Sequence, residues 1–130
     1  MIFLDTSFIV SYYVTSEKHH QKALKISKDI VGKEQIISRL IISEVVNVLH
    51  NKLKLDKEKI MELYYILNKN YTIIEDHHFY NQAMKMIMNY EKRLPFFDFI
   101  FMCVMEELEI KEIASFDEHF DLNKNINRIY

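Results

Sequence analysis

The sequence predicts an α/β fold in three layers, with helices on both faces of a central parallel sheet of four to five strands. Short apolar runs rich in Ile, Phe and Val alternate along the chain with longer segments whose apolar residues recur at helical spacing. Strands that alternate with helices are joined by right-handed crossovers, which make neighbouring strands parallel. The 130 residues include only one glycine and one proline, too few for the tight turns of a β-sandwich or barrel.

Each predicted strand is a short run of apolar, β-prone residues. Ile2-Phe3-Leu4 is typical, because it is apolar on both faces, as a buried parallel strand is, and polar residues follow it. The C-terminal tail has a similar character and is predicted to add an edge strand. The predicted strands, in order, are 2–4, 35–37, 71–74, 113–115 and 126–130.

Six helices are predicted between these strands, from the spacing of apolar residues and from residues that begin or end helices. Ser38 and Asp56 are N-cap candidates, Gly32 is a candidate C-terminal stop, and Pro95 stands where a helix begins. The helix after Pro95 is the most apolar, so we expect it at the centre of the fold. The predicted helices, in order, cover about 7–14, 18–31, 39–53, 57–69, 77–91 and 96–109.

Residues 1–130 are expected to form a single domain, because no repeat, linker or change of composition divides them. No apolar stretch approaches the roughly 20 residues that span a bilayer, and the N-terminus lacks the basic region of a signal peptide. We therefore expect a soluble, cytoplasmic protein without a membrane partner. The only cysteine, Cys103, lies in an apolar run and is expected to be a small buried residue. The scarcity of glycine excludes phosphate binding by a P-loop or dinucleotide-binding loop.

Two aspartates lie directly after predicted strands. Asp5 follows the first strand and Asp117 follows the fourth. Because ligands of open parallel sheets bind outside the carboxyl ends of the strands, these two acids are expected at one edge despite their separation in sequence. The alternative for either residue alone is a helix N-cap or turn residue.

Two further acids are placed where apolar residues surround them. Glu44 shares a helical stripe with Leu40, Ile41 and Val48, and Asp98 stands in the first turn of the most apolar helix. A buried carboxylate costs several kcal/mol unless it is paired or bound to a metal. The alternatives are a buried ion pair for Glu44, with Arg39 or a lysine, and a helix N-terminal acid for Asp98.

Four acids gathered at one place repel one another and are stable at neutral pH only if some are protonated or hard cations are bound. Oxygen ligands without cysteine favour Mg²⁺ or Mn²⁺ over zinc. The chemistry suited to such a site is metal-assisted cleavage of phosphodiester bonds.

Four segments resemble the motifs of PIN domains, in the order and spacing of that family. They are Met1-Ile2-Phe3-Leu4-Asp5-Thr6-Ser7, Ser38-Arg39-Leu40-Ile41-Ile42-Ser43-Glu44-Val45, Leu94-Pro95-Phe96-Phe97-Asp98-Phe99-Ile100 and Ile113-Ala114-Ser115-Phe116-Asp117-Glu118-His119-Phe120. Each motif is weakly specific, whereas the four together span nearly the whole chain. The large Phe99 and Phe101 depart from the third motif, which often has small residues after its aspartate.

The length also resembles VapC-type toxins of prokaryotic toxin–antitoxin pairs. That resemblance implies a Mg²⁺- or Mn²⁺-dependent endoribonuclease acting on RNA, usually a homodimer, held inactive by a cognate antitoxin protein. It implies that Asp5, Glu44, Asp98 and Asp117 are the catalytic, metal-binding acids. It implies auxiliary roles for Thr6, Ser7, Ser115 and Asp121.

Two alternatives stay open at this point: a PIN-fold nuclease of RNA processing or one acting on DNA, and a non-catalytic binding module. Arg39 and Arg93 are the arginines nearest to the motifs and are candidates to bind RNA phosphates, although exposed solubilising charges are the favoured interpretation. His119, two residues after Asp117, could reach the site, although a position outside the site is the favoured interpretation.

Overall fold

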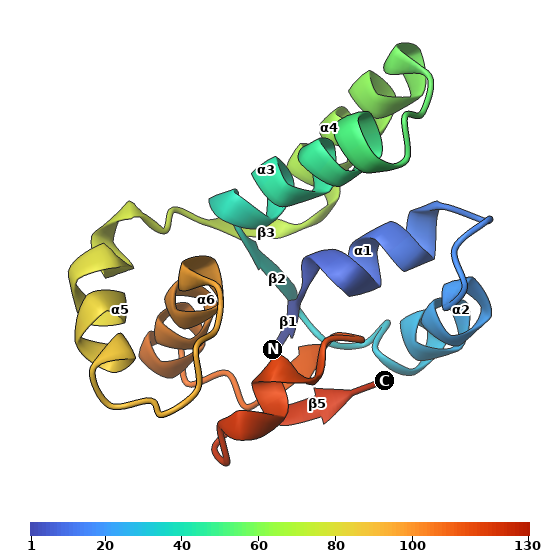
Figure 1. Cartoon of the computed structure of the whole chain (residues 1–130). Coiled ribbons are helices and arrows are strands. Elements are labelled where there is room, and N and C mark those ends of the chain that lie inside the picture. The colour runs from blue at the N-terminus through green and yellow to red at the C-terminus, as the bar shows by residue number, and fades with distance from the viewer.

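A five-stranded parallel sheet lies at the centre of the computed structural model, which describes residues 1–130 (Figure 1). The strands follow the order β3-β2-β1-β4-β5, so β1 is central and β5 is an edge strand. Phe3 of β1 pairs with Ile36 on one side and Ile113 on the other. The bounds of the strands are β1 (Ile2–Leu4), β2 (Gln35–Ser38), β3 (Thr72–Ile74), β4 (Glu112–Ala114) and β5 (Asn127–Ile129).

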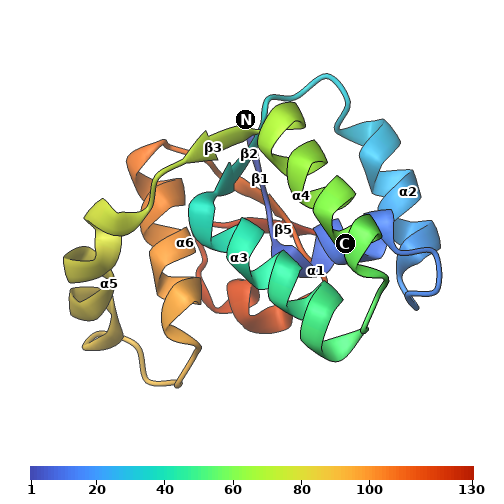
Figure 2. The same cartoon turned by 90° about the horizontal axis from the view of Figure 1, so that it is seen from above.

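Six α-helices surround the sheet, and the predicted three-layer α/β fold is confirmed. Figures 1 and 2 show α5 and α6 on one side of the sheet and α1 and α2 on the other. Helix α3 leads away from β2, and α4 packs beside it and returns to β3. The bounds of the helices are α1 (Thr6–Tyr13), α2 (His20–Asp29), α3 (Arg39–Asn47), α4 (Lys57–Asn70), α5 (Tyr80–Ile87) and α6 (Phe96–Glu107).

Helix α6 is central, as its composition predicts. Eight consecutive residues, from Asp98 to Met105, are buried, and Cys103 is among them. The strand residues Ile2, Phe3 and Leu4 are also fully buried, because β1 has a neighbouring strand on each side and helices on both faces. No helix has the length and apolar character that crossing a membrane requires.

Several helix ends differ from the sequence-based expectation. The helix predicted over about 39–53 changes at Val48–Lys52 into a π-helical turn, η1. The helix predicted over about 77–91 begins as a 3₁₀ turn and ends at Ile87, because the N–H groups of Met88 and Asn89 bond three residues back and tighten the chain. Pro95 occupies the N-cap position itself.

The capping interactions of the helices also differ from those that the sequence predicts. Ser38 and Asp56 stand at N-cap positions, but neither side chain makes a capping hydrogen bond. Asp76, which follows β3, accepts a hydrogen bond of 2.7 Å from the backbone N–H of Leu40 and so caps α3 from the neighbouring strand. Gly32 has no positive φ, and α2 ends earlier, at Asp29.

Candidate active site

The site is built around Asp5, which follows β1 at the carboxyl edge of the sheet. Its side chain is buried, with only 5% of the residue exposed. Its Oδ2 accepts hydrogen bonds from the hydroxyls of Ser115, at 2.7 Å, and Ser7, at 2.9 Å. The backbone N–H of Asp5 donates to the carbonyl of Ala114, which ties this residue to β4.

The same two hydroxyls hold the loop after β4 in place. Ser7 Oγ accepts from the backbone N–H of Phe116 at 2.9 Å, and Ser115 Oγ accepts from that of Asp117 at 3.0 Å. Each hydroxyl therefore accepts from the loop and donates to Asp5. This arrangement fixes Asp117 beside Asp5, although the two lie at opposite ends of the chain.

Glu44 reaches the site from α3. The hydroxyl of Thr6 donates to Glu44 Oε1 at 3.0 Å, so the first turn of α1 positions a carboxylate of α3. The residue is half-buried, in agreement with the inward stripe that its sequence neighbours predict.

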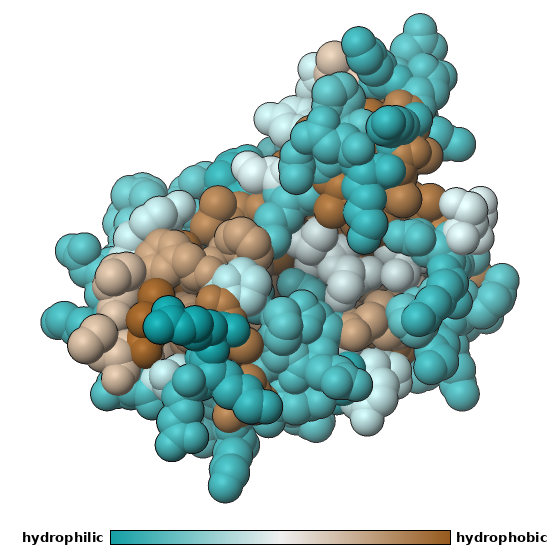
Figure 3. Space-filling view, viewed as in Figure 1, coloured by the Kyte–Doolittle hydropathy of each residue, from teal (hydrophilic) through white to brown (hydrophobic).

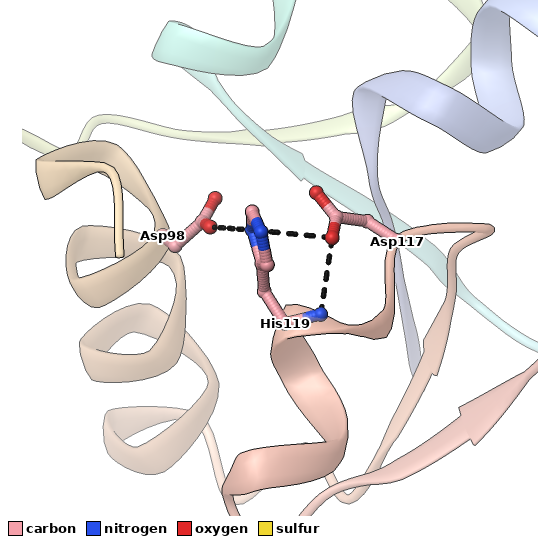
Figure 4. A group of neighbouring side chains, drawn as sticks. All are labelled: Asp98, Asp117 and His119. Atoms are coloured by element: carbon pink, nitrogen blue, oxygen red, sulfur yellow. Dashed lines mark hydrogen bonds and ion pairs between the residues drawn. The ribbon is translucent and has the colours of Figure 1, made fainter. Parts of the chain in front are cut away.

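Asp98 and Asp117 meet around an imidazole (Figure 4). Asp98, in the first turn of α6, is buried, and its Oδ2 lies 2.9 Å from Nδ1 of His119. The same nitrogen lies 3.1 Å from Asp117 Oδ1. Asp117 also caps the 3₁₀ turn η3 (Glu118–Leu122), since its Oδ1 accepts from the backbone N–H of His119.

All four carboxylates line one cleft of about 450 Å³. The hydroxyl residues Thr6 and Ser7 line it with them, and Phe97 and Phe116 contribute aromatic surface. Basic side chains are also present, because Lys18, His19 and Lys52 lie on the same cleft. The cleft thus combines four carboxylates with the ammonium groups of Lys18 and Lys52.

Burial and mutual repulsion make three of these acids, Asp5, Glu44 and Asp98, harder to ionise. Burial raises the pKa of Asp5, and the hydrogen bonds from Ser115 and Ser7 oppose that rise. Burial raises the pKa of Glu44 to about 7 and that of Asp98 to about 6, and the neighbouring carboxylates add to both. Neither Asp5 nor Glu44 has an ion-pair partner, and His119 is the only one for Asp98 and Asp117.

This donor set fits a hard divalent cation. Four carboxylates converge with no lysine or arginine among their ion-pair partners, so a cation would relieve both their repulsion and their desolvation. Asp5, Glu44, Asp98 and Asp117 could hold such an ion through oxygen, and His119 offers a nitrogen.

The PIN domain family model matches residues 2–125. The chain belongs to the PIN domain family. The crystal structure of the Mycobacterium tuberculosis toxin VapC20, described as cleaving the sarcin–ricin loop, has a similar fold, with a TM-score of 0.79. The two are 16% identical in sequence, and the similarity covers 95% of each chain. No curated protein matches this chain.

The acids that the PIN motifs indicate come together, whereas other candidates do not. Asp121 lies away from the cleft and accepts two hydrogen bonds of 2.8 Å from the guanidinium of Arg128. Arg39 is paired with Glu75 and is not among the residues that line the cleft. Arg93 is exposed and is not among them either.

Sequence reasoning about this PIN domain did not favour His119 as a site residue and did not identify the lysines of the cleft. His119 was considered within reach of the site but was not favoured as a site residue, and the turn that Asp117 caps places its ring between two acids. Its spacing of two residues from Asp117 was the available signal. Lys18 and Lys52 carry no local signal, because they approach the acids only through the packing of α1, α2 and α3.

Proposed function

We propose that this PIN domain is a Mg²⁺- or Mn²⁺-dependent endoribonuclease. The observation that carries the proposal is the gathering of Asp5, Glu44, Asp98 and Asp117 on one cleft without a lysine or arginine partner. A cluster of this kind is expected to bind a divalent cation at neutral pH, because the cation offsets the desolvation and mutual repulsion that raise the pKa values of Asp5, Glu44 and Asp98.

The bound cation would supply Lewis-acid activation of water and stabilisation of the leaving oxygen. The chain's own residues place its ligands. Ser7 and Ser115 orient Asp5, and Thr6 orients Glu44. The ammonium groups of Lys18 and Lys52 on the same cleft attract the phosphate backbone of RNA.

Cleavage of a structured RNA in Mg²⁺ or Mn²⁺ tests the proposal. The wild-type protein is expected to cut, whereas Asp5→Asn and Asp98→Asn are expected to lose activity by at least about two orders of magnitude. Asp121→Asn is a matched control, because that aspartate lies outside the cleft. Equal cleavage by the wild type and by Asp98→Asn would show that the site is wrongly assigned. Parallel assays with single-stranded and duplex DNA of the same sequence distinguish ribonuclease from deoxyribonuclease activity.

We infer further that the protein acts in the cytoplasm as the toxin of a VapBC-type pair, with an antitoxin protein as partner. The similarity of fold to the VapC20 toxin over nearly the whole of both chains supports this inference. Induced expression is expected to arrest growth, and co-expression of a small DNA-binding protein encoded beside it is expected to relieve the arrest. Harmless expression without any partner would contradict the toxin assignment.

A homodimer is the proposed assembly. Tyr80, Met84 and Met88 are exposed and recur every fourth residue, so they form an apolar stripe along α5 and its C-terminal turn. Figure 3 shows apolar surface gathered over the α5 and α6 side of the molecule. Such a surface is stabilised when a second copy covers it.

A further inference from the structure

His119 offers a donor atom that the acidic residues of the cleft do not: an imidazole nitrogen. One atom, Nδ1, lies 2.9 Å from a carboxylate oxygen of Asp98 and 3.1 Å from one of Asp117. Figure 4 shows the ring standing between the two carboxylates, which come from α6 and from the turn after β4.

These separations match the spacing of ligands around a small divalent ion. Two donors that lie roughly 2.1 Å from an ion, at right angles to each other, are roughly 3.0 Å apart. The donor atoms of Asp98, Asp117 and His119 all lie within 4.8 Å of one another, so all three can contact one ion.

The backbone of His119 is tied to Asp117. The N–H of His119 donates to Asp117 Oδ1 at 3.0 Å, which locks the two residues into one turn. The side chain of His119 is 42% exposed, whereas that of Asp98 is 5% exposed, so the imidazole lies on the solvent-accessible side of a buried carboxylate. An imidazole nitrogen that already lies beside two carboxylates needs little rearrangement to bind an ion together with them.

We propose that His119 is a nitrogen ligand of the divalent ion and makes the site prefer Mn²⁺ to Mg²⁺. Mg²⁺ prefers an all-oxygen shell, whereas transition ions accept imidazole readily. This inference rests on the metal-dependent function proposed above, and it extends the ligand set beyond the four acids.

Pulsed electron paramagnetic resonance of Mn²⁺ bound to the full chain tests the ligand directly, without RNA. The wild type is expected to show coupling of Mn²⁺ to a ¹⁴N nucleus, and His119→Asn is expected to lose that coupling. His19→Asn is the matched control, because His19 lines the same cleft without contacting the acids through an ion pair. Absence of ¹⁴N coupling in the wild type, or its persistence in His119→Asn, overturns the proposal.

Calorimetric titration with Mn²⁺ and with Mg²⁺ tests the preference. His119→Asn is expected to weaken Mn²⁺ binding about tenfold or more and to weaken Mg²⁺ binding less. Tighter Mn²⁺ binding by the variant would overturn the proposal. It would mean that the imidazole pairs with the carboxylates of Asp98 and Asp117 and competes with the ion for them.

Parallel RNA cleavage assays separate this inference from the proposed function. A wild-type protein that cleaves RNA without ¹⁴N coupling contradicts the role of His119 alone. A wild-type protein that shows the coupling but cleaves no RNA contradicts the proposed ribonuclease and leaves the ligand assignment standing.

Discussion

Replacing Glu44 by Gln is expected to stabilise the metal-free protein at alkaline pH. Burial raises the pKa of Glu44 from 4.5 to about 7, so the folded state binds more protons than the unfolded state between these values. The free energy of unfolding therefore falls as the pH rises from about 4.5 to 7 and stays lower above that window. Gln does not ionise, and its Oε1 can still accept the hydrogen bond that Thr6 donates to Glu44.

The size of the effect follows from the same pKa. The interval from 4.5 to about 7, at about 1.36 kcal/mol per pH unit, sets an upper bound of about 3.4 kcal/mol. Glu44 is only half-buried, so solvent screening reduces the expected gain to roughly 1 to 2 kcal/mol. For a domain of this size that corresponds to a rise in Tm of roughly 4 to 8 °C.

Urea denaturation in EDTA at pH 8 and pH 4 measures this difference. The free energy of unfolding of Glu44→Gln should be higher than that of the wild type at pH 8 and equal to it at pH 4. The control is Glu62→Gln, at an exposed position on α4, which should change the free energy of unfolding little at either pH. Saturating Mn²⁺ should reverse the order at pH 8, because a ligand of the native state stabilises it by mass action and the variant has lost one donor. A variant no more stable than the wild type at pH 8 in EDTA would refute the reasoning.

Three other predictions concern different parts of the molecule. Lys52→Ala should weaken RNA binding and lower the slope of log affinity against log salt by about 1, and an unchanged slope in fluorescence anisotropy would contradict a phosphate contact. Ser115→Ala should lower the free energy of unfolding by roughly 1 to 3 kcal/mol, because Asp5 loses a buried hydrogen bond; exposed Ser16→Ala is the control. Met84→Glu should convert the proposed dimer to a monomer in light scattering, and an unchanged mass would place the interface elsewhere.

Much of the fold was predictable because its signals are local. The run Ile2-Phe3-Leu4 is apolar on both faces, and only a strand inside a covered sheet buries it completely. Asp5 and Asp117 were predicted at one edge, because parallel strands end on the same side of a sheet. The spacing of Glu44 from Leu40, Ile41 and Val48 indicated its inward direction, since helix geometry alone sets which residues share a face.

The details that were not predicted depend on contacts between distant segments. Arg39 stands within a PIN motif, yet its guanidinium turns to Glu75, which follows a strand far along the chain. Ser38 is correctly placed as an N-cap, but Asp76 makes the capping bond from beyond β3. In both cases the sequence indicated where the residue stands, but it did not indicate which distant residue forms the hydrogen bonds there.

The sequence by itself determined the succession of strands and helices and the presence of acids at strand ends and on an inward helix face, because these follow from periodicity and chain order. Only the tertiary structure decided that Asp98 meets Asp117 through His119, and that Lys18 and Lys52 share their cleft. The physical reason is that a side chain reaches only a few ångströms. Which groups fall within that reach depends on how α6, η3 and the α1–α2 connection pack on the sheet, and that packing is a property of the whole chain.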